Sequence, residues 1–164
     1  MEQNVSMKIN ELPSPTWNWL KVNETSIKWS TKIEPCEIAA EGDAVATETE
    51  QLSDIETGAG READAIFATE NTAKYQILAD NAGQDKTVRL HISGKKDAHT
   101  AGCVEIVAKE NSTLTVVMDS RVAPDATKEE ESTAEASLAV RVRMKVESGA
   151  SVRLIQVQMP QEHE

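Results

Sequence analysis

The sequence has few aromatic residues, although hydrophobic residues as a whole are well represented. Phenylalanine, tyrosine and tryptophan make up 3% of the 164 residues, against 39% for all hydrophobic types. Any core must therefore consist of valine, isoleucine, leucine and alanine. Such an aliphatic interior suits stacked strands better than a helical bundle. The length allows one domain, or one small domain with an additional segment.

Cysteines and long apolar runs are also scarce. The two cysteines, Cys36 and Cys103, are too few for a disulfide framework. The N-terminus lacks the pattern of a signal peptide, and no apolar run approaches the ~20 residues of a membrane-spanning helix. We therefore expect a soluble cytoplasmic protein with reduced thiols.

Positive charge is nearly missing from one part of the chain. The formal net charge is -11, and residues 34–70 contain eleven acidic residues but only one basic residue, Arg61. Binding to nucleic acid or to an anionic membrane requires a lysine- and arginine-rich face, so neither is expected as a partner. Such a polar stretch buries little surface, and we expect residues 34–52 to be a loop or partly disordered.

The first 72 residues are expected to form a helical and acidic N-terminal segment. Residues 1–10 are predicted to be a frayed or weakly helical start, followed by a short helix that begins near Pro15. Trp17 and Trp19 lie on that helix. They offer a stacking surface for a base or a sugar, but a hydrophobic anchor is the simpler interpretation.

Two more elements are predicted before residue 73. A short strand is expected at Ser26–Trp29. Residues 61–72 are expected to form a helix, because Ala63, Ile66 and Phe67 are spaced three and four residues apart on one face.

The rest of the chain, residues 73–164, has the pattern of a strand-rich core. Tyr75–Ala79 is the first candidate strand, and several later runs alternate apolar with polar residues, as expected for strands with one buried face. The later runs, all rich in β-branched residues, are Val88–Ile92, Cys103–Val107, Leu114–Met118, Leu138–Met144 and Val152–Val157. Residues 120–136 interrupt the series with Pro124 and an acidic run, which we expect to be a solvated loop. The sequence thus predicts a mainly β protein.

A weak internal repeat lies within this core. Lys109–Val117 can be laid on Glu147–Ile155 with a shift of 38 positions, so that a small-residue turn leads into a strand in both copies. A turn-plus-strand unit that recurs without a helix suits a β-solenoid. An antiparallel β-sandwich accounts for the spacing equally well and stays the alternative.

Four residues are candidate metal ligands. His91, His99 and Cys103 lie close in sequence, and Cys36 can join them in space; imidazole and thiolate bind zinc or iron. The spacing matches no known metal motif, however. The alternative is that His91 faces solvent and that Cys103 is a small core residue.

The sequence shows no pattern of an enzyme. Catalytic serine elbows, phosphate-binding glycine loops and zinc-protease motifs are all missing from it. We therefore predict a protein without enzymatic activity.

Four stretches together resemble the SufB/SufD family of iron–sulfur cluster assembly proteins, most of all its short SufD-type members. They run in the family's order and cover nearly the whole chain. They are Leu12–Asn23 with Thr16-Trp17-Asn18-Trp19-Leu20, Ile55–Asp64 with Gly58-Ala59-Gly60-Arg61-Glu62, Glu105–Val116 with Glu110-Asn111-Ser112, and Gly149–Gln158 with Leu154-Ile155-Gln156-Val157-Gln158.

The resemblance implies a fold and a function. The fold is a right-handed parallel β-helix that follows short N-terminal helices. In the family, SufB and SufD pair through their β-helices and bind the ATPase SufC through C-terminal segments, and the complex is a scaffold for nascent iron–sulfur clusters. The resemblance thus implies a non-catalytic scaffold component. Its partners in the full-length protein would be a SufB/SufD-type paralogue and a SufC-type ATPase, with the iron–sulfur cluster belonging to the full complex.

The chain departs from the family in one respect. It stops at Glu164, before the later coils that contain the family's proposed cluster residues and before the SufC-binding segment. No catalytic or cluster residue is therefore carried over, and no cofactor is expected in this portion. An interrupted β-helix would leave its last coil open, so we expect a homodimer or a terminal segment to cover that end.

Two other functions stay open at this point. One is a β-sandwich module that binds carbohydrate through Trp17, Trp19 or Trp29. The other is a small metal-binding domain that uses His91 and its neighbours.

Overall fold

The computed structural model describes residues 4–9, 25–30, 32–52, 61–68, 71–80, 82–96, 98–122 and 136–158. These residues are mainly β, with one short helix, α1 (Arg61–Phe67). A small antiparallel sheet pairs β1 (Asn4–Ile9) with β2 (Thr25–Ser30).

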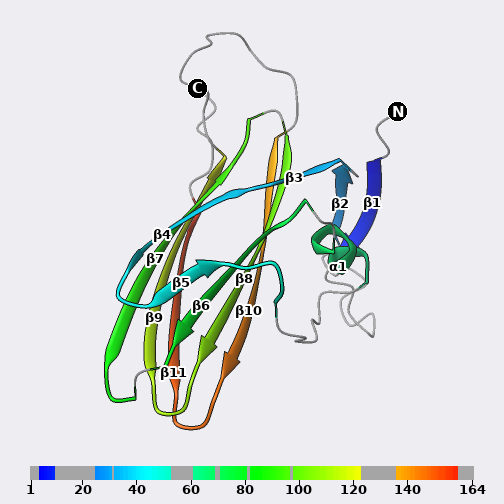
Figure 1. The fold of residues 1–164 in the computed structure, drawn as a ribbon. Coiled ribbons are helices and arrows are strands. Elements are labelled where there is room, and N and C mark those ends of the chain that lie inside the picture. Colours follow the sequence, from blue (N-terminus) through cyan, green and yellow to red (C-terminus); the bar gives the residue numbers. More distant parts are fainter. Residues whose placement is uncertain are drawn as a thin grey trace.

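Two larger sheets form the body of the protein (Figure 1). The first, named here the β8 sheet, contains β3 (Ile33–Pro35), β5 (Val45–Glu48), β6 (Ala73–Ala79), β8 (His99–Ala108) and β10 (Ser137–Val146). The second, the β9 sheet, contains β4 (Glu37–Gly42), β7 (Asp85–Gly94), β9 (Thr113–Val122) and β11 (Ser151–Gln158). From β6 onward the chain changes sheet with every strand.

The six long strands form four parallel pairs, each between strands two places apart in the chain. In the β8 sheet β6 pairs with β8 and β8 with β10, and in the β9 sheet β7 pairs with β9 and β9 with β11. At the other end of the stack, β5 is antiparallel to β6, and β4 is antiparallel to β7. Both sheets are therefore mixed, and the purely antiparallel sandwich considered from the sequence is wrong.

The register between β9 and β11 is the shift found in the sequence. Thr113 lies opposite Ser151, an offset of 38 residues, so the predicted superposition of these two segments is confirmed. Asp85 lies opposite Thr113 at an offset of only 28 residues. The repeat is thus irregular in length, which explains why it is weak in the sequence.

The turns that enter the β9 sheet have one backbone feature in common. Gly83, Asn111 and Gly149 all have positive φ, at 78°, 57° and 68°. Glycine adopts this conformation without strain, and asparagine tolerates it better than most residues. The turns are joined by hydrogen bonds from Gly83 N to Asn111 O (3.2 Å) and from Asn111 N to Ser148 O (3.0 Å).

The core lies between the two large sheets and is aliphatic, as expected. It contains fully buried side chains from both sheets, and Tyr75 packs against it as a partly buried neighbour. Its larger members are Ile77, Val88, Leu90, Ile92, Val104, Ile106, Leu114, Val116 and Met118. Hydrophobic burial of these alternate positions joins the sheets face to face.

The prediction of a loop over residues 34–52 is wrong, because this stretch contains β3, β4 and β5. Its alternate positions Ile38, Ala40 and Ala46 pack against the core, while Glu37 and Glu41 are exposed. A strand at the edge of a stack needs only one apolar face, so acidic side chains on the other face are compatible with it.

The expected N-terminal helices are not supported. Residues 4–9 form β1, and the helix predicted to begin near Pro15 lies outside the described residues. The helix predicted over 61–72 is limited to α1, which packs against β8. The strand predicted at Ser26–Trp29 is confirmed by β2. The boundary at residue 72 stays a prediction, although three strands that precede it pair with strands that follow it.

Candidate functional site

Two strands, β10 and β11, lie at one end of the stack with no described strand beyond them. They are the final strands in their sheets, with a neighbour on one side only among the described residues. In β8 every residue from Thr100 to Ala108 is buried, whereas no residue of β10 or β11 is. Four large apolar side chains are more than 40% exposed here: Met144, Val146, Ile155 and Val157. A row of unpaired backbone groups beside apolar side chains is typical of a docking edge.

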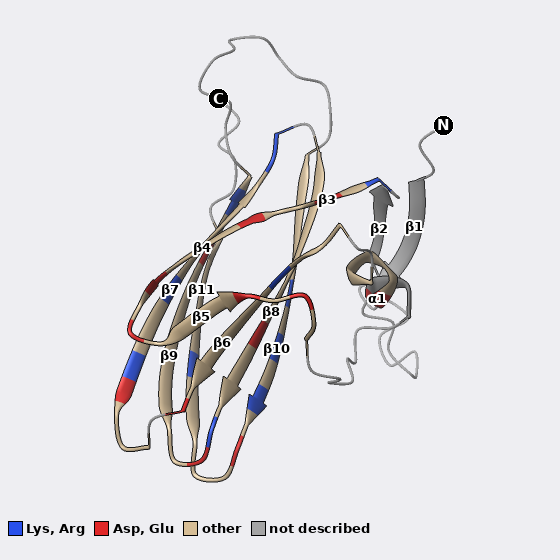
Figure 2. Cartoon of the chain, in the orientation of Figure 1, with Lys and Arg blue, Asp and Glu red and all other residues tan. Residues whose placement is uncertain are grey.

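The two ends of the stack carry opposite charge (Figure 2). We call β10 and β11 the basic edge: they contain Arg141, Arg143, Lys145 and Arg153 and no acidic residue. We call residues 33–50 the acidic cap: they contain Glu34, Glu37, Glu41, Asp43, Glu48 and Glu50 and no basic residue. A basic surface thus lies on the open side and an acidic surface on the side closed by antiparallel strands.

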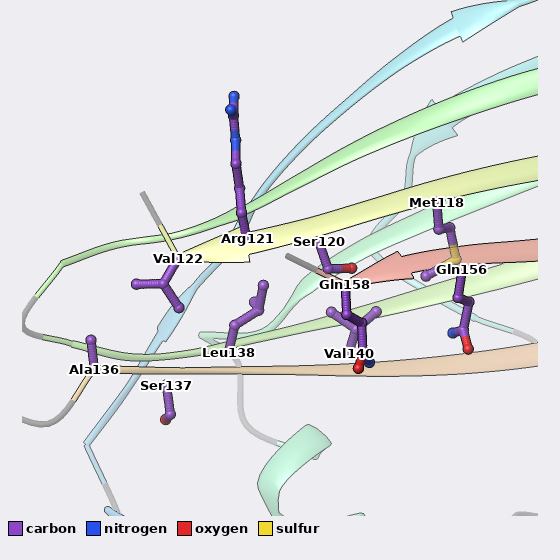
Figure 3. A pocket seen from close by; sticks show the side chains of 10 residues that line it. All are labelled: Met118, Ser120, Arg121, Val122, Ala136, Ser137, Leu138, Val140, Gln156 and Gln158. Carbon is purple, nitrogen blue, oxygen red and sulfur yellow. The ribbon is translucent and has the colours of Figure 1, made fainter. Parts of the chain in front are cut away.

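A pocket of about 600 Å³ opens between the sheets at this end of the stack (Figure 3). Met118 of β9 and Leu138 and Val140 of β10 form its apolar wall, and Gln156 and Gln158 of β11 line it with amides. Gln156 is in register with Met118. The inward position is thus apolar in β9 and polar in the last strand.

The side chains that line the inside of this pocket are uncharged. Arg121 lies on its rim and points away from the space between the sheets in Figure 3. The amides can exchange hydrogen bonds with a polar group, but of the described residues that line the pocket none is cysteine or histidine, the ligands typical of iron–sulfur clusters. The lining of the pocket is therefore closer to that of a partly solvent-exposed hydrophobic core than to that of an iron–sulfur cluster site.

His91 lies on the outer face of the β9 sheet between two carboxylates. Its Nδ1 is 2.6 Å from Asp119 Oδ2 on β9, and its Nε2 is 3.4 Å from Glu41 Oε1 on β4. Arg89 lies 4.0 Å from the same Glu41 oxygen. Because both ring nitrogens have partners, this arrangement links three adjacent strands rather than presenting a free base.

The other candidate ligands lie on different surfaces. Cys36 belongs to the core cluster between the sheets, where its sulfur packs against Gly102. Since side chains alternate along a strand, Cys103 and His99 point to the outer face of β8. They are four residues apart, roughly 13 Å along the strand. His99 Nδ1 is 2.6 Å from Ser137 Oγ.

The four predicted residues therefore do not meet. Cys36 is in the core, His99 and Cys103 are on one outer face, and His91 is on the opposite sheet. Within the described ranges no three histidine, cysteine or acidic side chains form a group that could hold a metal ion. Burial raises the pKa of the Cys36 thiol to about 11, which disfavours the thiolate that metals bind.

A polar cluster on the outer face of the β8 sheet was missed from the sequence. Glu105 is fully buried and accepts a hydrogen bond from Gln76 Nε2 (2.7 Å). Arg141 Nη1 donates to Asp64 Oδ1 of α1 (2.8 Å), and its guanidinium lies 4.7 Å from the centre of the Phe67 ring. The one signal in the sequence was a glutamate in the middle of the apolar run Cys103–Val107.

The tryptophans proposed for carbohydrate binding cannot be placed: Trp17 and Trp19 lie outside the described residues, as does the side chain of Trp29. No described helix is long and apolar enough to cross a membrane. Comparison with family models, with curated proteins and with solved structures found no match.

Proposed function

We propose that this chain is a scaffold component of a SUF-type system for iron–sulfur cluster assembly, without catalytic activity of its own. One observation carries the proposal. Two of the stretches that resemble the SufB/SufD family, Glu105–Val116 and Gly149–Gln158, contain β9 and β11 residues that pair in parallel at the offset of 38. In the strand register, two of the four resembling stretches thus lie in successive layers of one stack, as the β-helix implied by the resemblance requires.

We further propose that the six long strands are the opening coils of a right-handed parallel β-helix. Two features support a coil that repeats. The long strands pair in parallel with strands two places apart in the chain, and the equivalent turn residues Gly83, Asn111 and Gly149 all have a left-handed backbone conformation. An experimental structure tests the proposal directly. A left-handed crossover from β7 through β8 to β9 would contradict it.

The proposed partners are a SufB/SufD-type paralogue and a SufC-type ATPase. The cluster is the cargo of that assembly, and the cytoplasm is its expected location. The exposed edge of β10 and β11 supports a scaffold role, because parallel strands with free edges can be continued by further strands.

Co-purification from one cell tests the assignment. The full-length protein is expressed with a tag beside a SufC-type ATPase and a SufB-type partner, and the purified complex is analysed by mass spectrometry and visible absorbance. We expect both proteins to be retained and a cluster absorbance to appear after iron and sulfide are supplied.

Two variants at equivalent turns make this experiment sharper. Gly149→Val should disrupt the stack and lose the complex, while Gly83→Ala, at a turn with open space, should retain it. A folded protein that retains neither partner would contradict the proposal.

A further inference from the structure

The two ends of the strand stack are complementary to each other in charge and in exposed apolar surface. We infer that the basic edge of one copy docks on the acidic cap of a second copy, head to tail. The partner is a second copy of the same 164-residue chain, and the inference does not draw on the function proposed above, under which further strands would continue this edge.

Among the described residues, the large exposed apolar side chains lie on these two surfaces. Five large hydrophobic side chains of the described residues are more than 40% exposed. Met144, Val146, Ile155 and Val157 belong to the basic edge, and Val45, 50% exposed, belongs to β5 in the acidic cap. Contact between the two surfaces would cover all five, which favours association through the hydrophobic effect.

The charges favour head-to-tail contact over the symmetric alternative. Two basic edges brought together would set four arginine and lysine residues against the same four. Two acidic caps would set six carboxylates against six, although Glu34 is paired with Lys95 and Glu41 lies near Arg89. Joining a basic edge to an acidic cap opposes unlike charges instead. Arg141 is already paired with Asp64, so the exposed cations Lys145 and Arg153 carry most of this attraction.

The strand directions are compatible with such a contact. Strands β6, β8 and β10 run in one direction, and β5 runs opposite to them at the far edge of the β8 sheet. In the β9 sheet, β4 likewise runs opposite to β7, β9 and β11. A copy shifted along the stack would therefore place β10 against β5 and β11 against β4, both in the antiparallel sense. Antiparallel ladders form readily at free sheet edges.

A contact between two different surfaces repeats unless the rotation closes a ring. Two copies joined in this way still present one free basic edge and one free acidic cap between them, so the expected product is an open series rather than a dimer. The self-association should grow with protein concentration and weaken with salt, since exposed charges are screened.

The experiment is sedimentation velocity of the full chain over a range of concentrations. Two charge-reversal variants are compared with wild type: Lys145→Glu/Arg153→Glu on the basic edge, and Glu37→Lys/Glu48→Lys on the acidic cap. These four residues are exposed and lie outside the ion pairs described above. The charge of Lys145 contributes to the lowered pKa of the Glu147 carboxyl, and the fold should tolerate the changes. Circular dichroism and thermal unfolding check this.

Thr113→Glu is the control. Thr113 is also exposed, but it lies on β9 between two strands, opposite Asp85 of β7 and Ser151 of β11. This variant should associate as wild type does.

We expect wild type to form species larger than a dimer, and each double variant to weaken the association about tenfold or more. An equimolar mixture of the two double variants should restore pairing, because the unchanged basic edge of the cap variant then meets the unchanged acidic cap of the edge variant. A wild type that stays monomeric at all concentrations would overturn the inference. A dimer that the cap variant leaves unchanged would also overturn it, because two basic edges would then be pairing symmetrically. Association with a different protein but not with a second copy would overturn it as well.

Discussion

Lys109 and Glu147 occupy equivalent places in successive layers of the stack. The Lys109 ammonium donates to Glu147 Oε1 over 2.9 Å, and the two residues are separated by the 38 positions that also set the register of β9 and β11. This hydrogen bond holds the pKa of the Glu147 carboxyl below its ordinary value. Because both side chains reach solvent, the pair marks the register more than it stabilises the fold.

The glycine at the last of the three equivalent turns should tolerate substitution least. Gly149→Ala forces an alanine into φ of 68° and brings its Cβ against Asn111 Oδ1 in the layer below. We expect a loss of about 2 kcal/mol or more in the free energy of unfolding. Gly83→Ala has the same backbone requirement but nothing within 4 Å of the new Cβ, so about 1 kcal/mol is expected. Urea denaturation measures both; equal losses would show that the contact with Asn111 has no effect.

Gly102 and Cys36 should be coupled energetically. A Cβ at Gly102 would collide with the Cys36 sulfur in the core, so Gly102→Ala is expected to destabilise by about 1–3 kcal/mol. Cys36→Ala removes the obstructing atom and should recover part of that loss in the double variant. A double-mutant cycle by chemical denaturation gives the coupling, and strictly additive effects would refute the contact.

Cys36 should also make stability depend on pH in the alkaline range. Burial raises the pKa of its thiol from an ordinary value of 9.0 to about 11. Between these values the unfolded chain loses the thiol proton while the folded chain keeps it, so stability falls as pH rises from 9 to 11 and is unaffected below. The loss is at most about 3 kcal/mol. Cys36→Ala should remove the part of the fall in stability between pH 9 and 11 that this thiol causes. Identical profiles of stability against pH for the variant and wild type would contradict the assignment.

Arg141 should hold α1 on the β8 sheet. Its guanidinium pairs with Asp64 and lies over the Phe67 ring, with only 12% of the side chain exposed. Arg141→Ala is expected to cost about 1–2 kcal/mol and to speed amide exchange in α1, because the ion pair and the ring contact are lost together. Arg141→Lys keeps the charge but not the planar guanidinium, so its stability and its amide exchange in α1 should lie between those of wild type and Arg141→Ala. Unchanged exchange in α1 would show that other contacts hold the helix.

The long strands were predictable because their signal is local. The runs from Val88 to Val157 alternate with a period of two and are bounded by turn residues, and each corresponds to one of β7 to β11. Their pairing was indicated only by the offset between Lys109 and Glu147. The short strand β4 was missed because its acidic residues obscure the alternation of Ile38 and Ala40.

The candidate site was less predictable because it depends on which face each residue occupies. His99 and Cys103 share a face but lie too far apart along one strand, and His91 is on the other sheet. Glu105 occupies a position that alternation assigns to the outer face, yet it is fully buried beside Gln76. A local sequence pattern does not indicate which other segments of the chain cover the outer face of a sheet.

The connection between β9 and β10 shows how this architecture tolerates change. Residues 95–98 join β7 to β8, whereas residues 123–136 make the equivalent connection one layer later, yet the parallel register continues without a slip on either side. Chain length at this rim is therefore uncoupled from the packing of the interior. Evolution or an engineer can lengthen this rim to carry a new peptide or epitope while the strands beneath keep their partners.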